Sequence, residues 1–243
     1  MQKKLFYGLL ISLLFPLALQ AAPGDPISVE NTYIDVPTAE VLDSYQVSFL
    51  TRAYDHGTLM ETIDFGVYPR INLGLSIAAH ELVGSSNSVR VLTPDFQVKW
   101  RVYDGNLYMP AVAIGYDGRR YGYGYDNHRR YTRTKKYLDD RKGGYVSFSR
   151  EIFFPGLTAT AGVNMSEFKL DEIHFFTGTF LRLTDSLGLM AEWDNLRNIR
   201  DSRANVGARI CLHPSVALDA AVRRLGRGDE SERILQLRYA THF

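Results

Sequence analysis

The chain has 243 residues, with 28 Lys and Arg, 27 Asp and Glu, and a formal net charge of +1 at pH 7. This near balance argues against a nucleic-acid-binding protein, which would carry a basic surface. A single cysteine, Cys211, excludes an internal disulfide framework.

The first 21 residues have the layout of a secretory signal peptide. Lys3 and Lys4 precede an apolar run of about 15 residues, which ends at small residues around Ala21. A membrane anchor is the alternative, but the run is shorter than the ~20 residues that a spanning helix needs, and Pro16 interrupts it. We therefore expect a signal peptide at 1–21, followed by an N-terminal periplasmic segment at 22–44.

From residue 45 onward the chain consists of short alternating segments separated by turn residues, which predicts an all-β protein. The twelve candidate strands are 45–54, 58–68, 71–82, 94–103, 107–117, 143–151, 157–167, 173–184, 187–196, 204–212, 216–225 and 233–243. Tight connections rich in Asp, Asn, Gly and Pro alternate with connections that are mostly longer and polar. This alternation is typical of a membrane barrel with short periplasmic turns and longer outer loops.

The two faces of the predicted strands separate a membrane barrel from a soluble β-sandwich. Within 94–103, Phe96, Val98 and Trp100 alternate with Gln97, Lys99 and Arg101. The polar faces of other segments are rich in Gly, Ala and Ser, which suit the crowded inside of a narrow barrel better than a solvated surface. Tyr and Trp near the strand ends fit aromatic belts at membrane interfaces. We predict an antiparallel up-and-down transmembrane β-barrel of about 12 strands at 45–243, in the bacterial outer membrane, with the soluble sandwich as the alternative.

The last segment, 233–243, alternates apolar and polar residues up to Phe243. Such a strand needs a partner on each edge, because an open edge invites aggregation. In a closed barrel it pairs with the preceding strand and with the first one, at 45–54. The alternation and the terminal Phe also resemble the C-terminal signal of bacterial outer-membrane proteins, which implies the barrel assembly machinery as a partner.

Four stretches carry a resemblance to a known family. The stretch IDVPTAEVLDSYQVSF, at 34–49, resembles the "D/T-x-PTA-x-x-L" opening of the YjbH-type (GfcD-like) exopolysaccharide-associated outer-membrane proteins. The stretches 65–77, 96–118 and 149–163 resemble strand units of the same family, so that the likeness covers about residues 30–165. Full members are much longer, and this chain has room for one short barrel unit. The resemblance implies an outer-membrane barrel linked to surface polysaccharide.

The predicted outer loop at 118–136 is strongly basic and interleaved with tyrosine. Arg side chains bind carboxylate and phosphate in a forked geometry, and Tyr faces suit sugar rings. An anionic polysaccharide or a lipopolysaccharide phosphate is therefore a candidate partner, and a solvated loop without a specific ligand is the alternative. The candidate contact residues are Arg119, Arg120, Tyr123, Arg129, Arg130, Tyr131 and Arg133.

The lumen is the second candidate site. On the predicted register its cations are Arg52, Lys99, Arg101, Arg182, Arg209, Arg223 and Arg238. An excess of cations would attract anionic solutes into a narrow channel. The alternative is a salt-bridged interior, because the same face carries Asp64, Asp117, Glu192, Asp194 and Asp219.

These features predict a non-enzymatic barrel for passage or binding of an anionic saccharide or surface polysaccharide, in contact with outer-membrane lipid and lipopolysaccharide. A non-conducting structural or assembly barrel is the first alternative, and a lipid acyl hydrolase is the second. For a hydrolase, only His80 has nearby hydroxyls, at Ser76, Ser85 and Ser86. We find no metal-ligand spacing and no phosphate-binding glycine loop, and we expect no cofactor.

Overall fold

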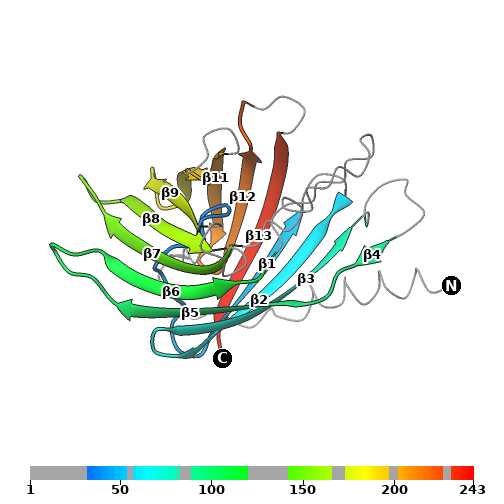
Figure 1. Ribbon diagram of the computed structural model, residues 1–243, viewed down its shortest axis with the longest axis horizontal. Helices are drawn as coiled ribbons and strands as arrows, with labels where there is room; N and C mark the ends of the chain where they lie inside the picture. Colours follow the sequence, from blue (N-terminus) through cyan, green and yellow to red (C-terminus); the bar gives the residue numbers. More distant parts are fainter. Residues whose placement is uncertain are drawn as a thin grey trace.

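The computed structural model describes residues 32–53, 57–80, 82, 89–119, 142–165, 173–196, 202–226 and 231–243. In these residues, antiparallel strands form a closed barrel of twelve long strands, with one further two-residue strand, β4, beside β3 (Figure 1). The predicted all-β barrel is therefore confirmed. Among the residues described, none belongs to a helix long and apolar enough to cross a membrane.

The strand bounds follow the predicted segments closely. They are β1 (Gln46–Ala53), β2 (Leu59–Tyr68), β3 (Ile71–His80), β4 (Arg90–Val91), β5 (Asp95–Tyr103), β6 (Ala111–Asp117), β7 (Gly143–Glu151), β8 (Leu157–Met165), β9 (Ile173–Arg182), β10 (Leu187–Asp194), β11 (Arg203–His213), β12 (Val216–Arg223) and β13 (Glu232–His242). Each long strand pairs with the long strands that precede and follow it in the chain. The short strand β4 is passed over, so that β3 pairs with β5. The ring closes where β1 pairs with β13, as the regular last strand predicts.

One strand begins later than the sequence predicts. The segment expected from residue 107 becomes β6 only at Ala111. The side chain of Asn106 accepts hydrogen bonds from the backbone N–H groups of Tyr108 and Met109, both at 2.8 Å. Pro110, which has no N–H to donate to a ladder, follows at once. These local bonds compete with strand pairing and extend the turn.

The connections divide the barrel into two ends. The turns β2–β3, β5–β6, β7–β8, β9–β10 and β11–β12 lie at one end, which we call the tight-turn end. The opposite ends of the strands form the other end of the barrel, which we call the long-connection end. The C-terminus lies at the tight-turn end, where the N–H of Phe243 donates to the carbonyl of Tyr45 at 3.0 Å (Figure 1).

The outer surface of the barrel is apolar. On β3, Leu73, Leu75 and Ile77 are exposed, while Asn72 and Ser76 between them are buried inside. Exposed aromatic side chains gather at the tight-turn end: Tyr45, Tyr68, Tyr108, Phe153, Phe154 and Phe243. An apolar band bordered by aromatic residues is what a membrane-spanning barrel presents to lipid.

Candidate functional site

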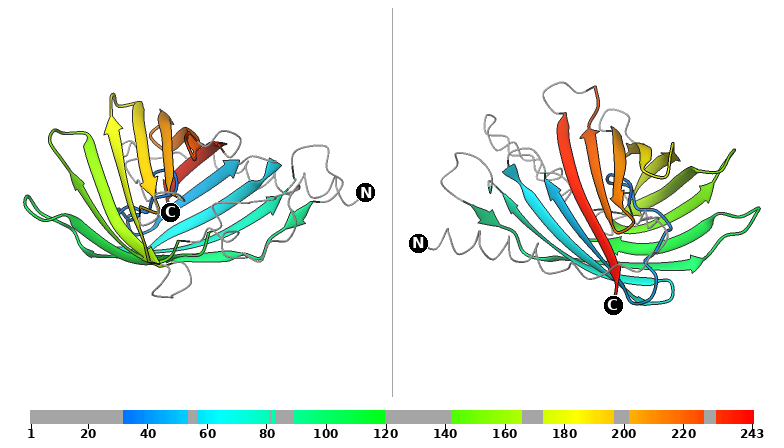
Figure 2. Two further views of the ribbon diagram at one scale, coloured as in Figure 1. Left: turned by 45° about the horizontal axis from the view of Figure 1, so that its top comes forward. Right: turned by 180° about the vertical axis from the view of Figure 1, so that it is seen from behind.

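Residues 32–44, which we call the inner segment, run inside the barrel before β1 begins (Figure 2). Tyr33, Ile34, Val36 and Ala39 are all 1% exposed or less. Its first part is a tight loop, which we call the tip loop (residues 32–37), closed by a bridge between Thr32 and Pro37. The sequence assigns 22–44 to a periplasmic segment. The part of it that the structure describes lies in the lumen instead, because its apolar side chains are buried against the wall.

The apolar side chains of the inner segment pack against the inner face of the wall. Tyr33 and Ile34 share a cluster with Phe180 and Met190, and Val36 packs with Tyr145 and Phe176. The rings of Tyr33 and Phe180 are stacked, with centroids 6.2 Å apart. Room for this packing comes from small residues on the wall. At Gly178, a Cβ atom would meet the ring of Tyr33 at 2.9 Å.

Four arginines line one side of the lumen, and we call them the arginine row: Arg52, Arg238, Arg223 and Arg209. They come from β1, β13, β12 and β11, which are consecutive strands of the sheet. Arg52, Arg209 and Arg223 are each 1% exposed, and Arg238 is 7% exposed. Side chains alternate between the two faces of a strand, so these arginines point inward while the residues beside them in sequence point outward.

Two carboxylates divide the arginine row between them. Asp35, in the tip loop, lies 2.5 Å from Arg52 and 2.9 Å from Arg223. Asp219, on β12, lies 2.7 Å from Arg209 and 2.6 Å from Arg238. Arg223 also contacts Glu232. Each buried guanidinium of the row is therefore paired with a carboxylate, as the salt-bridged alternative requires.

Burial of Asp35 disfavours its charged form, but Arg223 and Arg52 outweigh that effect. They hold the pKa of the Asp35 carboxyl well below its usual range. Asp35 belongs to the inner segment rather than to a strand of the barrel wall. The tip loop thus carries a fixed negative charge at neutral pH.

The backbone of the tip loop is also bound by the wall. Glu192 on β10 accepts hydrogen bonds from the N–H groups of Ile34, Asp35 and Val36, at 2.7 to 3.0 Å. Arg52 donates to the carbonyl of Ile34 at 3.1 Å, and Arg238 donates to that of Tyr33 at 3.0 Å. Wall side chains therefore satisfy backbone groups that no strand partner reaches.

The rest of the inner segment is held on the opposite side of the barrel. Lys99 on β5 donates to the carbonyl of Glu40 at 2.9 Å, and Arg101 pairs with the Glu40 carboxylate at 3.0 Å. Ser149 on β7 and Asn72 on β3 accept from the N–H groups of Ala39 and Leu42. The inner segment therefore crosses the lumen and contacts strands around the ring.

The predicted lumen cations are distributed unevenly. Arg52, Lys99, Arg209, Arg223 and Arg238 are buried inside the barrel, and their role in ligand binding stays a prediction. The side chain of Arg101 is 19% exposed and lies beside Glu40, nearer the tight-turn end. Arg182 is exposed at the tight-turn end of β9. Of the seven predicted cations, four therefore form the arginine row and three, Lys99, Arg101 and Arg182, lie outside it.

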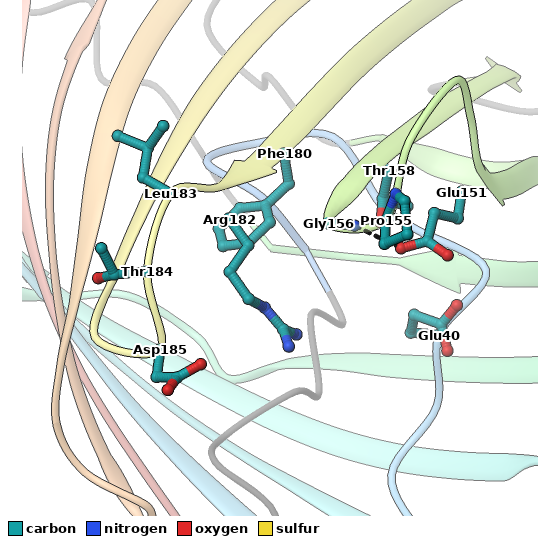
Figure 3. A pocket seen from close by; sticks show the side chains of 10 residues that line it. All are labelled: Glu40, Glu151, Pro155, Gly156, Thr158, Phe180, Arg182, Leu183, Thr184 and Asp185. Atoms are coloured by element: carbon teal, nitrogen blue, oxygen red, sulfur yellow. Dashed lines mark hydrogen bonds between the residues drawn. The ribbon is translucent and has the colours of Figure 1, made fainter.

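A cavity of about 420 Å³ opens beside Arg182 (Figure 3). The guanidinium of Arg182 points into it, between Asp185 and Glu40. Thr158 and Glu151 line the other side, on the β7–β8 hairpin. The cavity lies at the tight-turn end, where the inner segment meets the wall.

The predicted basic loop lies mostly outside the described residues. Arg120, Tyr123, Arg129, Arg130, Tyr131 and Arg133 belong to that part of the chain. Arg119 is described, and it is buried and paired with Asp117 at 2.7 Å. This residue therefore lies inside the barrel with its charge paired, and the others stay a prediction.

The hydrolase alternative depended on His80 and nearby serines. His80 Nδ1 is hydrogen-bonded to Thr58 at 3.0 Å. Ser76 accepts a hydrogen bond from Gln97 at 2.9 Å, and Ser85 and Ser86 lie outside the described residues. No Ser–His pair is therefore formed among the described residues of this group.

The sequence did not predict the part played by the inner segment. It picked Arg52 and Arg223 as lumen residues, but not Asp35 as their partner. The available signal was the share of apolar residues between Tyr33 and Leu42, which a solvated periplasmic segment does not need. Asp35 lies 17 residues from Arg52 and 188 residues from Arg223 in the chain. Strand periodicity therefore does not reveal these contacts.

No family model matches the chain, and no curated protein matches its sequence. Among solved structures, the chain is similar to a KdgM porin with a TM-score of 0.54 and 10% sequence identity, over 81% of this chain and 99% of that one. It is also similar to a KdgM porin in complex with disordered oligogalacturonate, with a TM-score of 0.50 and 8% identity, over 82% of this chain and 99% of that one. At these identities the likeness establishes the fold alone, a closed antiparallel barrel of twelve long strands.

Proposed function

We propose that this chain is a bacterial outer-membrane barrel that takes an anionic saccharide into its lumen. The observation that carries the proposal is the arginine row, which places four guanidinium groups on four consecutive strands. Arginine binds planar carboxylates through paired N–H donors, and a narrow lumen focuses the field of such groups. A saccharide bearing carboxylates suits this wall better than a neutral one.

The outer-membrane location is supported by the outer surface. Apolar side chains face outward on the strands, and aromatic side chains surround the tight-turn end. In this account the wall contacts outer-membrane lipid and lipopolysaccharide, and the tight-turn end faces the periplasm. The regular last strand, β13, supports recognition by the barrel assembly machinery.

The class of saccharide is supported by the fold neighbour. A KdgM porin has been captured with oligogalacturonate, whose every sugar ring carries a carboxylate. Association with exopolysaccharide is a narrower proposal, and it depends on the YjbH-type motifs at 34–49, 65–77, 96–118 and 149–163. Neither proposal requires an enzymatic activity or a cofactor.

A non-conducting structural or assembly barrel is the second candidate. The observation that favours it is the inner segment, which crosses the lumen and pairs with the arginine row. A purely structural barrel needs no exchange of these contacts.

The two candidates differ in ligand binding. We would measure binding of oligogalacturonate to the refolded full chain in detergent by calorimetry, with a neutral maltooligosaccharide of equal length as the control. We expect binding of the acidic saccharide alone, weakened by added salt because the attraction is electrostatic. Equal binding of both saccharides, or binding of neither, would contradict the proposed function.

A further inference from the structure

The tip loop places its own carboxylate in the arginine row. Asp35 lies between Arg52 and Arg223, at 2.5 and 2.9 Å, and is itself 1% exposed. Both guanidinium groups approach from neighbouring parts of the wall, on β1 and β12. A pair of arginines in this arrangement recognises a carboxylate through its geometry and charge, whichever molecule carries it.

We propose that Arg52 and Arg223 form a carboxylate-binding subsite, that Asp35 is its internal occupant, and that a sugar-acid carboxylate replaces Asp35 when the tip loop leaves. The inner segment is then a displaceable part of the barrel that competes with the saccharide. This inference rests on the proposed function, since it names the place where the anionic saccharide binds.

The groups around Asp35 match the other parts of a sugar acid. Glu192 accepts hydrogen bonds from N–H groups of the tip loop, and saccharide hydroxyls donate hydrogen bonds to a carboxylate in the same way. Phe180 stacks on Tyr33, and an aromatic face of this sort suits a sugar ring. One carboxylate site, one acceptor for hydroxyls and one ring face therefore lie together on the wall.

The wall of the subsite is built to remain when the tip loop leaves. Arg52 and Arg223 stand on strands that pair with a neighbour on each edge. Asp219 continues to neutralise Arg209 and Arg238, and Glu232 continues to contact Arg223. Among the described residues, the four guanidinium groups of the arginine row then remain with three wall carboxylates, those of Asp219, Glu232 and Glu192. The vacated subsite is therefore cationic, which favours entry of an anion.

The tip loop is attached to the wall differently from a strand. Within the inner segment it is closed by one bridge, between Thr32 and Pro37. Its polar ties to the wall are side-chain contacts: they come from Glu192, Arg52, Arg223 and Arg238, and from the hydroxyl of Tyr33 to that of Thr160. These are the contacts that an incoming carboxylate and its hydroxyls take over.

The test compares two variants of the full chain, Asp35→Asn and Asp43→Asn. Both remove one negative charge from the inner segment, but Asp43 is exposed and lies outside the arginine row. Each protein is refolded in detergent, its barrel is verified by heat-modifiable gel mobility, and its affinity for oligogalacturonate is measured. Because the internal competitor is weakened, Asp35→Asn is expected to bind about tenfold more tightly than the wild type, and Asp43→Asn about as tightly as the wild type.

A reversible lock tests the inference without removing a charge. Ala39 packs with Ala113 on β6, so a disulfide between Ala39→Cys and Ala113→Cys, with Cys211→Ser, would fix the inner segment in place. We expect the oxidised protein to lose oligogalacturonate binding and the reduced protein to regain it.

The outcomes separate the inference from the function on which it rests. If the wild type binds oligogalacturonate and neither Asp35→Asn nor the lock alters the affinity, the subsite is wrong and the proposed function stands. If the wild type, the variants and the reduced lock all fail to bind, both are wrong. Tighter binding by Asp35→Asn alone, or loss of binding in the oxidised lock, supports the subsite.

Discussion

At the scale of single residues, the lumen is organised by two carboxylates with different attachments. Asp219 is a wall residue on β12 and is fully buried between Arg209 and Arg238. Asp35 belongs to the inner segment and bridges Arg52 and Arg223. The first carboxylate is therefore expected to stabilise the barrel, and the second to hold the inner segment in the lumen.

Replacing Asp219 should destabilise the barrel strongly. Asp219→Asn leaves Arg209 and Arg238 without their shared carboxylate, and breaking a buried pair typically costs about 3–5 kcal/mol. The control is Asp104→Asn, which breaks the exposed pair with Arg70 and the contact with Arg101 at 3.5 Å and is expected to cost less than about 1 kcal/mol. The measurement is the free energy of unfolding in urea, in detergent. Equal losses of unfolding free energy for the two variants would show that Asp219 stabilises the barrel no more than an exposed carboxylate does.

The charge on Asp35 makes docking of the inner segment pH-dependent. Because the pKa of Asp35 is lowered in the folded protein, its stabilising contribution is present above the ordinary carboxyl pKa of about 4 and is lost as the pH falls below it. Arg223, Arg52 and Lys142 favour the charged form of Asp35, and the Glu192 carboxylate accepts a hydrogen bond from the Asp35 N–H. We expect ion conductance to stay constant from pH 7 to about 4 and to rise below that. An identical rise in Asp35→Asn would assign it to other groups.

At the scale of elements, strand alternation is what the sequence predicts best. The inward and outward residues of 94–103 and 233–243 have the predicted orientation, since Lys99, Gln97 and Gln236 are buried while Phe96 and Leu235 are exposed. A period of two is enough for this, because it is a local property of the chain. Aromatic residues are less predictable: Tyr145 lies near the start of β7, where the sequence suggests an interfacial belt, but it is buried against Val36 in the lumen.

Strand β3 tests the outward face. Leu75 is 60% exposed at the middle of the strand, and an Arg on the lipid side near the midplane costs about 2–4 kcal/mol. We therefore expect Leu75→Arg to lower the free energy of unfolding in lipid vesicles by this amount. Ser186→Arg, in an exposed turn, is the matched control and should have little effect. A neutral result at Leu75 would place this face outside the membrane.

Strand β9 tests how the inner segment fits the wall. Gly178→Val introduces side-chain atoms where the ring of Tyr33 lies, and overpacking of this kind costs about 1–3 kcal/mol. We expect Glu-C protease to cut after Glu40 about tenfold faster than in the wild type, because the inner segment spends more time away from the wall. Ala161→Val, on the outer face of β8, is the control. Equal rates would mean that Gly178 does not limit docking.

At the scale of the whole molecule, the barrel and the inner segment were not equally predictable. The barrel follows from many repeated local signals, and its closure follows from the regular last strand. Placement of the inner segment depends on contacts such as Asp35 with Arg223, which lie 188 residues apart in the chain. These contacts form only after closure brings β1, β12 and β10 around one space. No periodic pattern in the sequence predicts these contacts.

The arginine row and the filled lumen occur together for an electrostatic reason. A row of arginines without counter-charges would be costly to bury. The inner segment supplies one of the carboxylates and fills the space, while leaving a wall with the chemistry of an anion site. The two candidate functions therefore differ only in whether the inner segment exchanges.

The most direct test is planar-bilayer conductance of the refolded protein, with residues 33–39 either intact or replaced by a Gly/Ser linker. We predict that the linker variant gives larger, anion-selective steps than the intact protein, and that oligogalacturonate blocks them while a neutral maltooligosaccharide does not. A linker variant that folds but stays silent, or whose current ignores the acidic saccharide, would contradict the account and leave a structural barrel.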